Sequence, residues 1–345
     1  MNHLKAMTDD TGIFQHSNFC IPKRNEGYTT DDNARALVVC TIYYGLKKDS
    51  QIEKLARIYL AFLNHMQKPE GSFHNYLGYG RTFSDVDGSE ESYGRSLWAC
   101  GCVINSNLPK DVKMVAKDIF DKGLPWVWKS TWLRFYATTI LGLTQYYQAS
   151  EDNELRDSVE KLGDFIFQHY QDEAKDDWHW FEHCLTYDNA RLTQAMFEAY
   201  GIVGKQEYLD AAKESMDFLL KTQMIDGVFV PIGNDGWFKH GGKRAFYDQQ
   251  PLEAAALVEA AIDAYCVTKE KDYLQVADKA FEWFLGKNSR NVVVYDHVTG
   301  GCCDGLGTNK VNMNQGAESS VSYLLARLKL EECRRGFWKQ KKRLD

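Results

Sequence analysis

The 345-residue sequence has no long hydrophobic run. Its apolar stretches fall well short of the ~20 residues that a transmembrane helix needs. Residues 1–10 contain no apolar core, so we expect no signal peptide. The net charge is −7, which argues against nucleic acid or an anionic membrane as the main partner.

The motifs of common cofactor sites are also missing. The chain contains no G-x-G-x-x-G and no G-x-x-x-x-G-K-[ST] sequence, which argues against a nucleotide phosphate loop. His179, Glu182 and His183 do not form the H-E-x-x-H pattern of zinc proteases. We therefore expect neither a cofactor nor a metal.

Nine cysteines occur at irregular spacing, which does not suggest a disulfide framework. The vicinal pair Cys302 and Cys303 is interpreted as inert, although His297 could act as a base for a reactive thiol. We expect a reducing, cytoplasmic setting, while a mature secreted chain would have a similar N-terminus. Four other cysteines lie in apolar helical patterns and are interpreted as small buried residues: Cys40, Cys100, Cys102 and Cys266.

One polar sequence occurs twice. Thr30–Arg35 and Thr186–Arg191 share the pattern T-x-D-N-A-R, each at the start of an apolar helical stretch. Similar polar clusters precede further apolar stretches near residues 90, 133, 248 and 316. Recurrence over such intervals indicates stacked supersecondary units.

Each unit is expected to contain a pair of helices. The first helix is apolar or small on nearly all faces, as in 252–265, and the second has one polar face, as in 51–67. Helices that are apolar all round are buried on all sides. This difference favours an inner ring of six helices wrapped by an outer ring over an open solenoid.

The sequence therefore predicts an all-α fold, an (α/α)6 toroid of six helical hairpins. We expect one domain over 1–345, with an irregular arm at 1–27 and a basic, disordered tail at 334–345. Eleven helices are clear, so the twelfth must come from the arm or from the C-terminal end. Short β-hairpins are expected in the loops at 227–232 and 291–295.

The chain resembles the six-hairpin superfamily of carbohydrate-active proteins, which includes glycoside hydrolases, polysaccharide lyases and N-acylglucosamine 2-epimerases. The pair Asp31-Asp32 is similar to the Asp-Asp pair of some α-mannanases of this fold, without their flanking aromatics. Residues 7–13 and 28–37 also look like helical domains associated with bacterial sugar-transferring enzymes. The resemblance implies an active site at the N-terminal ends of the inner helices, and an association with such an enzyme.

Carboxylates at these helix starts are the candidate catalytic groups. Glycoside hydrolysis needs one protonated and one ionised carboxyl group, roughly 5–9.5 Å apart. In a closed ring of six units, Asp32 and Asp188 would face each other, and that separation favours inversion. The candidates are, in order, Asp32 and Asp188, then Asp248 and Asp31, then Glu91. The alternative is that these residues only cap helices.

Amides, arginines and loop aromatics are the candidate binding groups. Aromatics make up 13% of the chain, and sugar C–H faces stack on aromatic rings. The arginines could instead pair with the capping carboxylates, and the tryptophans could be packed within their loops. The predicted substrate-binding residues are Asn33, Arg35, Arg95, Tyr136, Trp180, Asn189, Arg191, Trp237, His240, Tyr247, Gln249 and Glu318.

The predicted function is hydrolysis of a small oligosaccharide by a pair of carboxylates. A sugar epimerase or isomerase is the first alternative, although no histidine lies at a predicted helix start. A polysaccharide lyase is the second, because arginines could neutralise a uronate. The third is a non-catalytic domain that binds carbohydrate or a partner enzyme.

Overall fold

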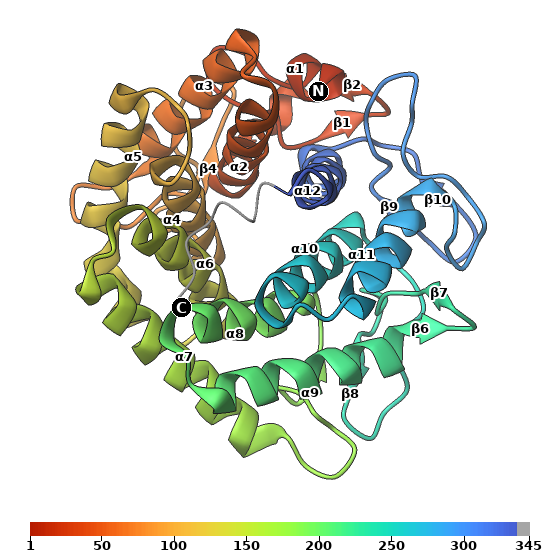
Figure 1. Ribbon diagram of the computed structural model, residues 1–345. Coiled ribbons are helices and arrows are strands. Elements are labelled where there is room, and N and C mark those ends of the chain that lie inside the picture. The colour runs from red at the N-terminus through yellow and green to blue at the C-terminus, as the bar shows by residue number, and fades with distance from the viewer. Residues whose placement is uncertain (337–345) are drawn as a thin grey trace. The chain divides into compact units, whose positions relative to one another are not determined.

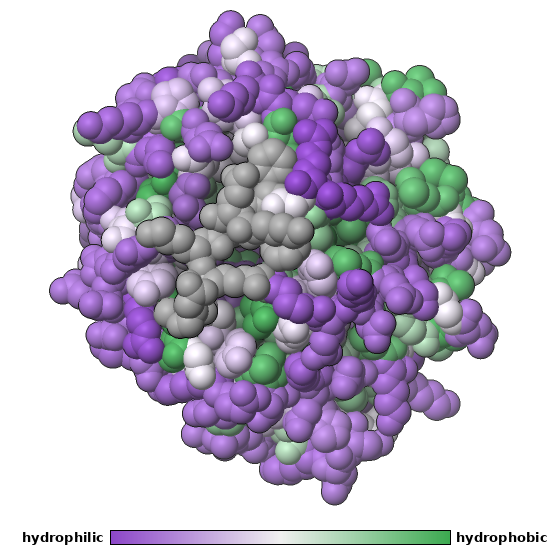
Figure 2. All heavy atoms as spheres, in the orientation of Figure 1, coloured by the Kyte–Doolittle hydropathy of each residue, from purple (hydrophilic) through white to green (hydrophobic). Residues whose placement is uncertain are grey.

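The computed structural model describes residues 1–336, so most of the predicted basic tail, 337–345, lies outside the described residues. This part of the chain forms twelve α-helices, three 3-10 helices and paired strands of two residues each. It divides into two compact units. Unit 1 comprises residues 1–158 and 315–317, and unit 2 comprises residues 159–314 and the chain from residue 318. The face seen in Figure 2 is mainly hydrophilic.

Unit 1 is built from helical hairpins (Figure 1). Its elements are α1 (Asn2–Ala6), β1 (Ser17–Asn18), β2 (Ile21–Pro22), η1 (Arg24–Glu26), β3 (Tyr28–Thr29), α2 (Thr30–Lys47), α3 (Ser50–Met66), β4 (Tyr76–Leu77), α4 (Glu90–Ile104), α5 (Lys110–Gly123), η2 (Leu124–Lys129) and α6 (Leu133–Ser150). β1 pairs with β2 and β3 pairs with β4, both antiparallel.

The first helices of successive hairpins pack on one another. α2 contacts α4, and α4 contacts α6, while α2 also packs against α3 and α4 against α5. Burial follows this order: α2 is buried continuously from Asp32 to Thr41, whereas α3 buries one stripe that includes Tyr59 and Leu63. The predicted difference between the two kinds of helix is confirmed for this pair.

α4 and α6 meet backbone to backbone. A Cβ atom added at Gly101 would lie 2.2 Å from the carbonyl oxygen of Gly142, and one at Gly142 would lie 2.6 Å from that of Leu97. Only glycine leaves room for this approach.

We expect Gly101→Ala to lower the free energy of unfolding by about 1–3 kcal/mol, because the added methyl group overpacks the contact between α4 and α6. Gly45 in α2 is the matched control, since a Cβ atom added there would meet no heavy atom within 4 Å. Gly45→Ala is expected to raise stability by up to ~1 kcal/mol through helix propensity. Urea denaturation measures both, and equal effects would contradict the close contact.

The N-terminal arm is fixed inside unit 1. Nε2 of His3 in α1 donates to the carbonyl of Gln315 at 2.8 Å, and the N–H of Ala317 donates to the carbonyl of Gln15 at 3.0 Å. Residues 315–317 lead directly into the last helix. The short helix α1 brings the number of α-helices in the described chain to twelve.

Unit 2 continues the same pattern. Its elements are α7 (Asn153–Glu173, which begins in unit 1), β5 (Cys184–Leu185), α8 (Ala190–Val203), α9 (Gln206–Gln223), β6 (Met224–Ile225), β7 (Val228–Phe229), β8 (Phe238–Lys239), α10 (Pro251–Thr268), α11 (Asp272–Glu282), η3 (Trp283–Leu285), β9 (Gly305–Leu306), β10 (Val311–Asn312) and α12 (Ala317–Arg334). α8 packs on α10, and every residue of α10 from Pro251 to Ala264 is buried.

One of the two expected loop hairpins is present. β6 and β7 pair around Asp226 and Gly227. The segment 291–295 makes only an isolated bridge between Tyr295 and Cys302. The side chain of Asn288 bonds both the N–H and the carbonyl of Val292, so these backbone groups are not available to a partner strand.

Candidate functional site

The helix start at Thr30–Arg35 is held by its own side chains. Oγ1 of Thr29 accepts from the N–H of Asp32 at 3.1 Å and donates to Oδ2 of Asp32 at 2.7 Å. This is N-cap geometry. Asp32 is only 4% exposed, and NH2 of Arg35 lies 3.1 Å from its Oδ1. Thr29 is therefore the N-cap, the Asp32 carboxylate accepts from it, and the catalytic role of Asp32 stays a prediction.

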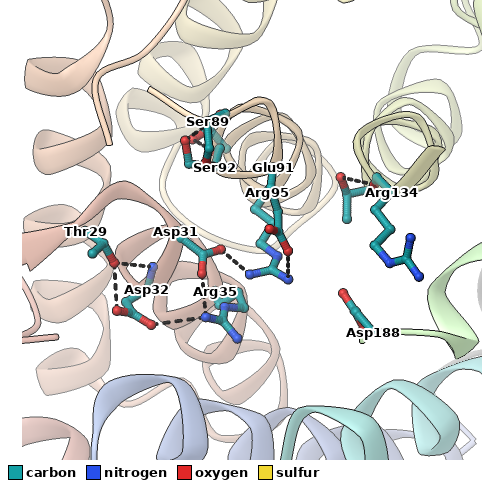
Figure 3. A network of polar contacts seen from close by, with 12 residues as sticks. Thr29, Asp31, Asp32, Arg35, Ser89, Glu91, Ser92, Arg95, Arg134 and Asp188 are labelled. Carbon is teal, nitrogen blue, oxygen red and sulfur yellow. Dashed lines mark hydrogen bonds and ion pairs between the residues drawn. The ribbon is translucent and has the colours of Figure 1, made fainter. Parts of the chain in front are cut away.

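Asp31 links α2 to α4 (Figure 3). Its carboxylate accepts from Arg35 at 2.6 Å and from Arg95 at 2.5 Å, and Arg95 also contacts Glu91 at 2.6 Å. Burial alone would raise the pKa of Asp31, but the two guanidinium groups outweigh it and lower that pKa. Asp31 is thus an ionised acceptor, and its exposed fraction of 20% leaves it accessible.

Two predicted binding residues of unit 1 are bonded to the backbone. Asn33 accepts from the N–H of Ile13 at 3.0 Å and donates to the carbonyl of Thr29 at 2.8 Å. The hydroxyl of Tyr136 donates to the carbonyl of Ser130. Both side chains are buried, and these contacts favour structural roles.

The second copy of the motif lies in unit 2 and has a different partner. Asp188 adopts a φ of +47°, and its N–H donates to the carboxylate of Glu253. Asn189 donates to the same carboxylate at 3.0 Å. Glu253 comes from the first turn of α10, where an acidic residue is ordinarily explained by the helix dipole. No sequence signal indicated that it holds the start of α8.

Arg191 continues this contact into the buried region of unit 2. It lies 3.5 Å from Asp188 and 3.2 Å from Glu259, and it donates to Gln194. Asp188 and Arg191 are 1% and 2% exposed. Burial raises the pKa of Glu259 although Arg191 opposes the shift. Arg191 therefore neutralises buried carboxylates, and its contact with a sugar stays a prediction.

Three loops of unit 2 are joined through their backbones ahead of α10. The N–H groups of Asn234 and Asp235 donate to the carbonyls of Asp248 and Tyr247 at 2.8 and 3.1 Å. Gln249 and Leu306 exchange two further hydrogen bonds. These bonds bring Asp235, Asp248 and the segment that contains Asp304 together.

The carboxyl group of Asp248 lies over the chain beside Asp304. A Cβ atom at Gly305 would lie 3.0 Å from its Oδ1. Burial raises the pKa of Asp248, and the charges of Asp235 and Asp304 raise it further. Asp304 is itself held by Ser319, whose hydroxyl donates to Oδ1 at 2.9 Å. A carboxyl group whose pKa is raised by burial and by neighbouring carboxylates is suited to act as the acid of an acid–base pair.

Asp248 was predicted from the sequence, whereas Asp235 and Asp304 were not. Both missed residues lie in Gly-rich loops next to segments that the sequence did single out. Their role depends on bonds between loops that are distant in the chain, so the local pattern contained no signal for it.

An aromatic ring borders the Asp235 loop. Trp237 is 37% exposed, and its indole N–H donates to Oδ1 of Asn234 at 2.8 Å. Tyr247 precedes Asp248 and is half-buried. Trp180 is different: it is 0% exposed and packs edge-on against Phe181 at 5.2 Å. No face of Trp180 is open to a sugar in this structure.

The other predicted residues of unit 2 fall into separate places. Gln249 is fully buried, donates to Ser289 at 2.8 Å and accepts from Trp283 at 3.0 Å, which is a structural set of contacts. His240 stacks on Trp178 with ring centroids 4.8 Å apart. Glu318 is half-buried in the first turn of α12.

Two kinds of feature are absent from the described chain. Residues 1–336 contain no cluster of three or more His, Cys, Asp or Glu side chains suited to a metal ion. Over the same range, no helix is both long and apolar enough to cross a membrane.

Comparison with known proteins shows likeness only at the level of structure. No family model and no curated protein matches the chain. A D-mannose isomerase matches with a TM-score of 0.76 and 13% identity, over 97% of this chain and 95% of that one. The cellobiose 2-epimerase from Bacillus thermoamylovorans B4167 matches with a TM-score of 0.73 and 13% identity, over 97% of this chain and 95% of that one. A family 76 α-mannanase from Bacteroides thetaiotaomicron matches with a TM-score of 0.69 and 12% identity, over 97% of this chain and 94% of that one.

These likenesses define the class of fold. The chain shares the all-α, (α/α)6-toroid fold of these proteins, and the sequence-based prediction of that fold is confirmed. The neighbours carry out different reactions on carbohydrates, so the fold by itself selects no one of them.

Proposed function

We propose that the chain hydrolyses a glycosidic bond in a small oligosaccharide, with Asp248 as the general acid. The observation that carries this proposal is the raised pKa of Asp248 beside Asp235 and Asp304. Glycoside hydrolysis requires a carboxylic acid that protonates the leaving oxygen, and a second carboxylate that activates water or attacks the anomeric carbon. Asp304, positioned by Ser319, is the proposed second carboxylate.

Other exposed groups would bind the sugar. Trp237 presents a ring beside the Asp235 loop, and Tyr247 adjoins Asp248. In unit 1, Asp31 and Glu91 are joined through Arg95, and their catalytic role stays a prediction. Asp32 and Asp188 are second to Asp248 as catalytic candidates because of their burial. A cytoplasmic location and an association with a sugar-transferring enzyme remain predictions.

The rate of hydrolysis is expected to depend on pH in a bell-shaped manner. The acid works while protonated, so kcat/KM should fall as pH rises through the raised pKa of Asp248. It should also fall at low pH, where the second carboxylate becomes protonated. A pH profile of kcat/KM on a cleaved oligosaccharide measures both limbs. A profile that stays flat on the alkaline side would contradict the role of Asp248.

A sugar epimerase or isomerase is the second candidate. The paired strands β5 and β8 bring His183 and His240 together, with ring centroids 6.0 Å apart. Two histidines at this separation could remove and return a proton at one carbon of an open-chain sugar. The likeness to an isomerase and an epimerase supports this alternative.

One assay separates these candidates. The chain is incubated with a panel of neutral oligosaccharides and monosaccharides, and the products are identified by mass and by proton NMR. Hydrolysis releases smaller sugars, and proton NMR shows which anomer is formed first. Epimerisation gives an isomer of unchanged mass. Binding without any product would favour the non-catalytic alternative and would overturn the proposal.

A further inference from the structure

Unit 1 contains a cavity of about 230 Å³ beside the starts of α4 and α6. Its walls come from the loop between α3 and α4, from the first turns of α4 and α6, and from η2. Sites for drug-sized ligands usually enclose about 300–1,000 Å³. This cavity is smaller and therefore suits one sugar ring. None of the binding residues predicted from the sequence lines it.

The apolar wall of the cavity is fixed without a ligand. The indole N–H of Trp126 donates to the carbonyl of Glu70, which sets the plane of the ring. Phe73 and Phe135 lie 5.3 and 5.2 Å from Tyr93 between ring centroids, and the Tyr93 hydroxyl donates to the backbone of Gly123. A ligand that stacks on these rings would not have to order them first.

The polar wall offers one hydrogen-bond donor, Lys129, and one acceptor, Glu90, which are not paired with each other. Nζ of Lys129 lies 3.4 Å from the centroid of Trp126, and Glu90 is the exposed first residue of α4. Within residues 1–336, neither charge lies in ion-pair range of an opposite one. The other lysine of the wall, Lys68, is paired with Asp87 at 2.6 Å.

We propose that this cavity binds one neutral pyranose ring. The C–H face of the sugar would lie on the face of Trp126 that Lys129 leaves open, one hydroxyl would accept from Lys129, and a neighbouring hydroxyl would donate to Glu90. The formal charges of the wall cancel, since two lysines face Asp87 and Glu90, so an additional anionic group on the sugar would find no unpaired excess of positive charge. This site goes beyond the proposed hydrolysis and does not depend on it.

The test uses the full chain with Asp248→Asn, so that the probes are not consumed. Methyl α-D-mannopyranoside and methyl α-D-glucopyranoside are titrated in turn, and binding is followed by saturation-transfer NMR and by the indole N–H signal of Trp126. That signal is assigned with Trp126→Phe. We expect at least one glycoside to shift it.

Variants of the wall locate the site. Trp126→Ala should weaken binding about tenfold, and Lys129→Met and Glu90→Gln, both at the surface, should each weaken it several-fold. Trp128→Ala is the matched control, because Trp128 is an exposed residue of the same short helix and does not line the cavity. The affinity of the Trp128→Ala variant for the glycosides should equal that of the Asp248→Asn chain without it.

Three results would overturn the proposal. They are an unshifted Trp126 signal with both glycosides, an affinity unchanged by Lys129→Met and Glu90→Gln, and tighter binding of D-glucuronate than of the neutral glycosides. Hydrolysis is measured separately with the wild-type chain, so failure of the cavity and failure of the proposed activity are distinguishable.

Discussion

Replacing Asp248 by asparagine is expected to lower kcat about 10²- to 10⁴-fold on an oligosaccharide, the usual contribution of general acid–base catalysis. Asparagine has nearly the shape of aspartic acid but no acidic proton. The backbone bonds of Asp248 to Asn234 and of Gln249 to Leu306 do not involve the side chain, so the loops should keep their arrangement. Steady-state kinetics of purified variants measure the loss.

The leaving group distinguishes loss of the acid from general damage. The dinitrophenolate group of a dinitrophenyl glycoside leaves without being protonated. Asp248→Asn should therefore slow cleavage of this substrate far less than cleavage of an oligosaccharide. Asp226→Asn is the matched control, because Asp226 is exposed in the turn between β6 and β7. Equal losses on both substrates, or a loss with Asp226→Asn, would contradict the assignment.

Replacing Arg35 by methionine is expected to reduce the free energy of unfolding by about 3–5 kcal/mol, because the buried carboxylate of Asp32 loses this counter-charge. Arg35 is 2% exposed and contacts Asp31 at 2.6 Å and Asp32 at 3.1 Å. Methionine keeps the apolar stem but supplies no charge. Urea denaturation followed by circular dichroism measures the loss.

Arg57 provides the matched comparison, because it also contacts two carboxylates, Glu53 at 3.0 Å and Asp111 at 2.7 Å, but is 43% exposed. Solvent screens such pairs, so Arg57→Met should change stability much less. Combining Arg35→Met with Asp32→Asn should recover part of the loss, since the amide needs no counter-charge. Equal effects of Arg35→Met and Arg57→Met would show that burial does not control the cost.

Much of the fold could be predicted because its signals are local. The run 51–67 was expected as a helix with one polar face, and α3 spans Ser50–Met66. Thr29 and Ser89 cap α2 and α4 through bonds within one turn, which sequence spacing can reveal. The segment 291–295 did not form the expected hairpin, because the side chain of Asn288 bonds the backbone of Val292 and the carbonyl of Phe284 accepts from the N–H groups of Val294 and Tyr295.

The candidate site was predictable only in part. The sequence identified Asp31, Glu91 and Asp248 as acidic residues near helix starts, but it ranked the buried Asp32 and Asp188 above them. A repeated motif shows which positions are equivalent, and it does not show which carboxylates face solvent. Trp180 illustrates the same limit: a tryptophan in an aromatic loop can stack on a ligand or pack inside, and here it is buried.

The sequence by itself determined the helix pairs, the difference between fully apolar and one-sided helices, and hence the class of fold, because helix periodicity and caps act within a few residues. Only the tertiary structure decided which carboxyl groups carry a raised pKa and which arginines are buried counter-charges. Asp248 acquires its shift from burial and from Asp235 and Asp304, which other loops bring beside it. Electrostatic interactions act through space, and the distances between these loops follow from packing and not from their order along the chain.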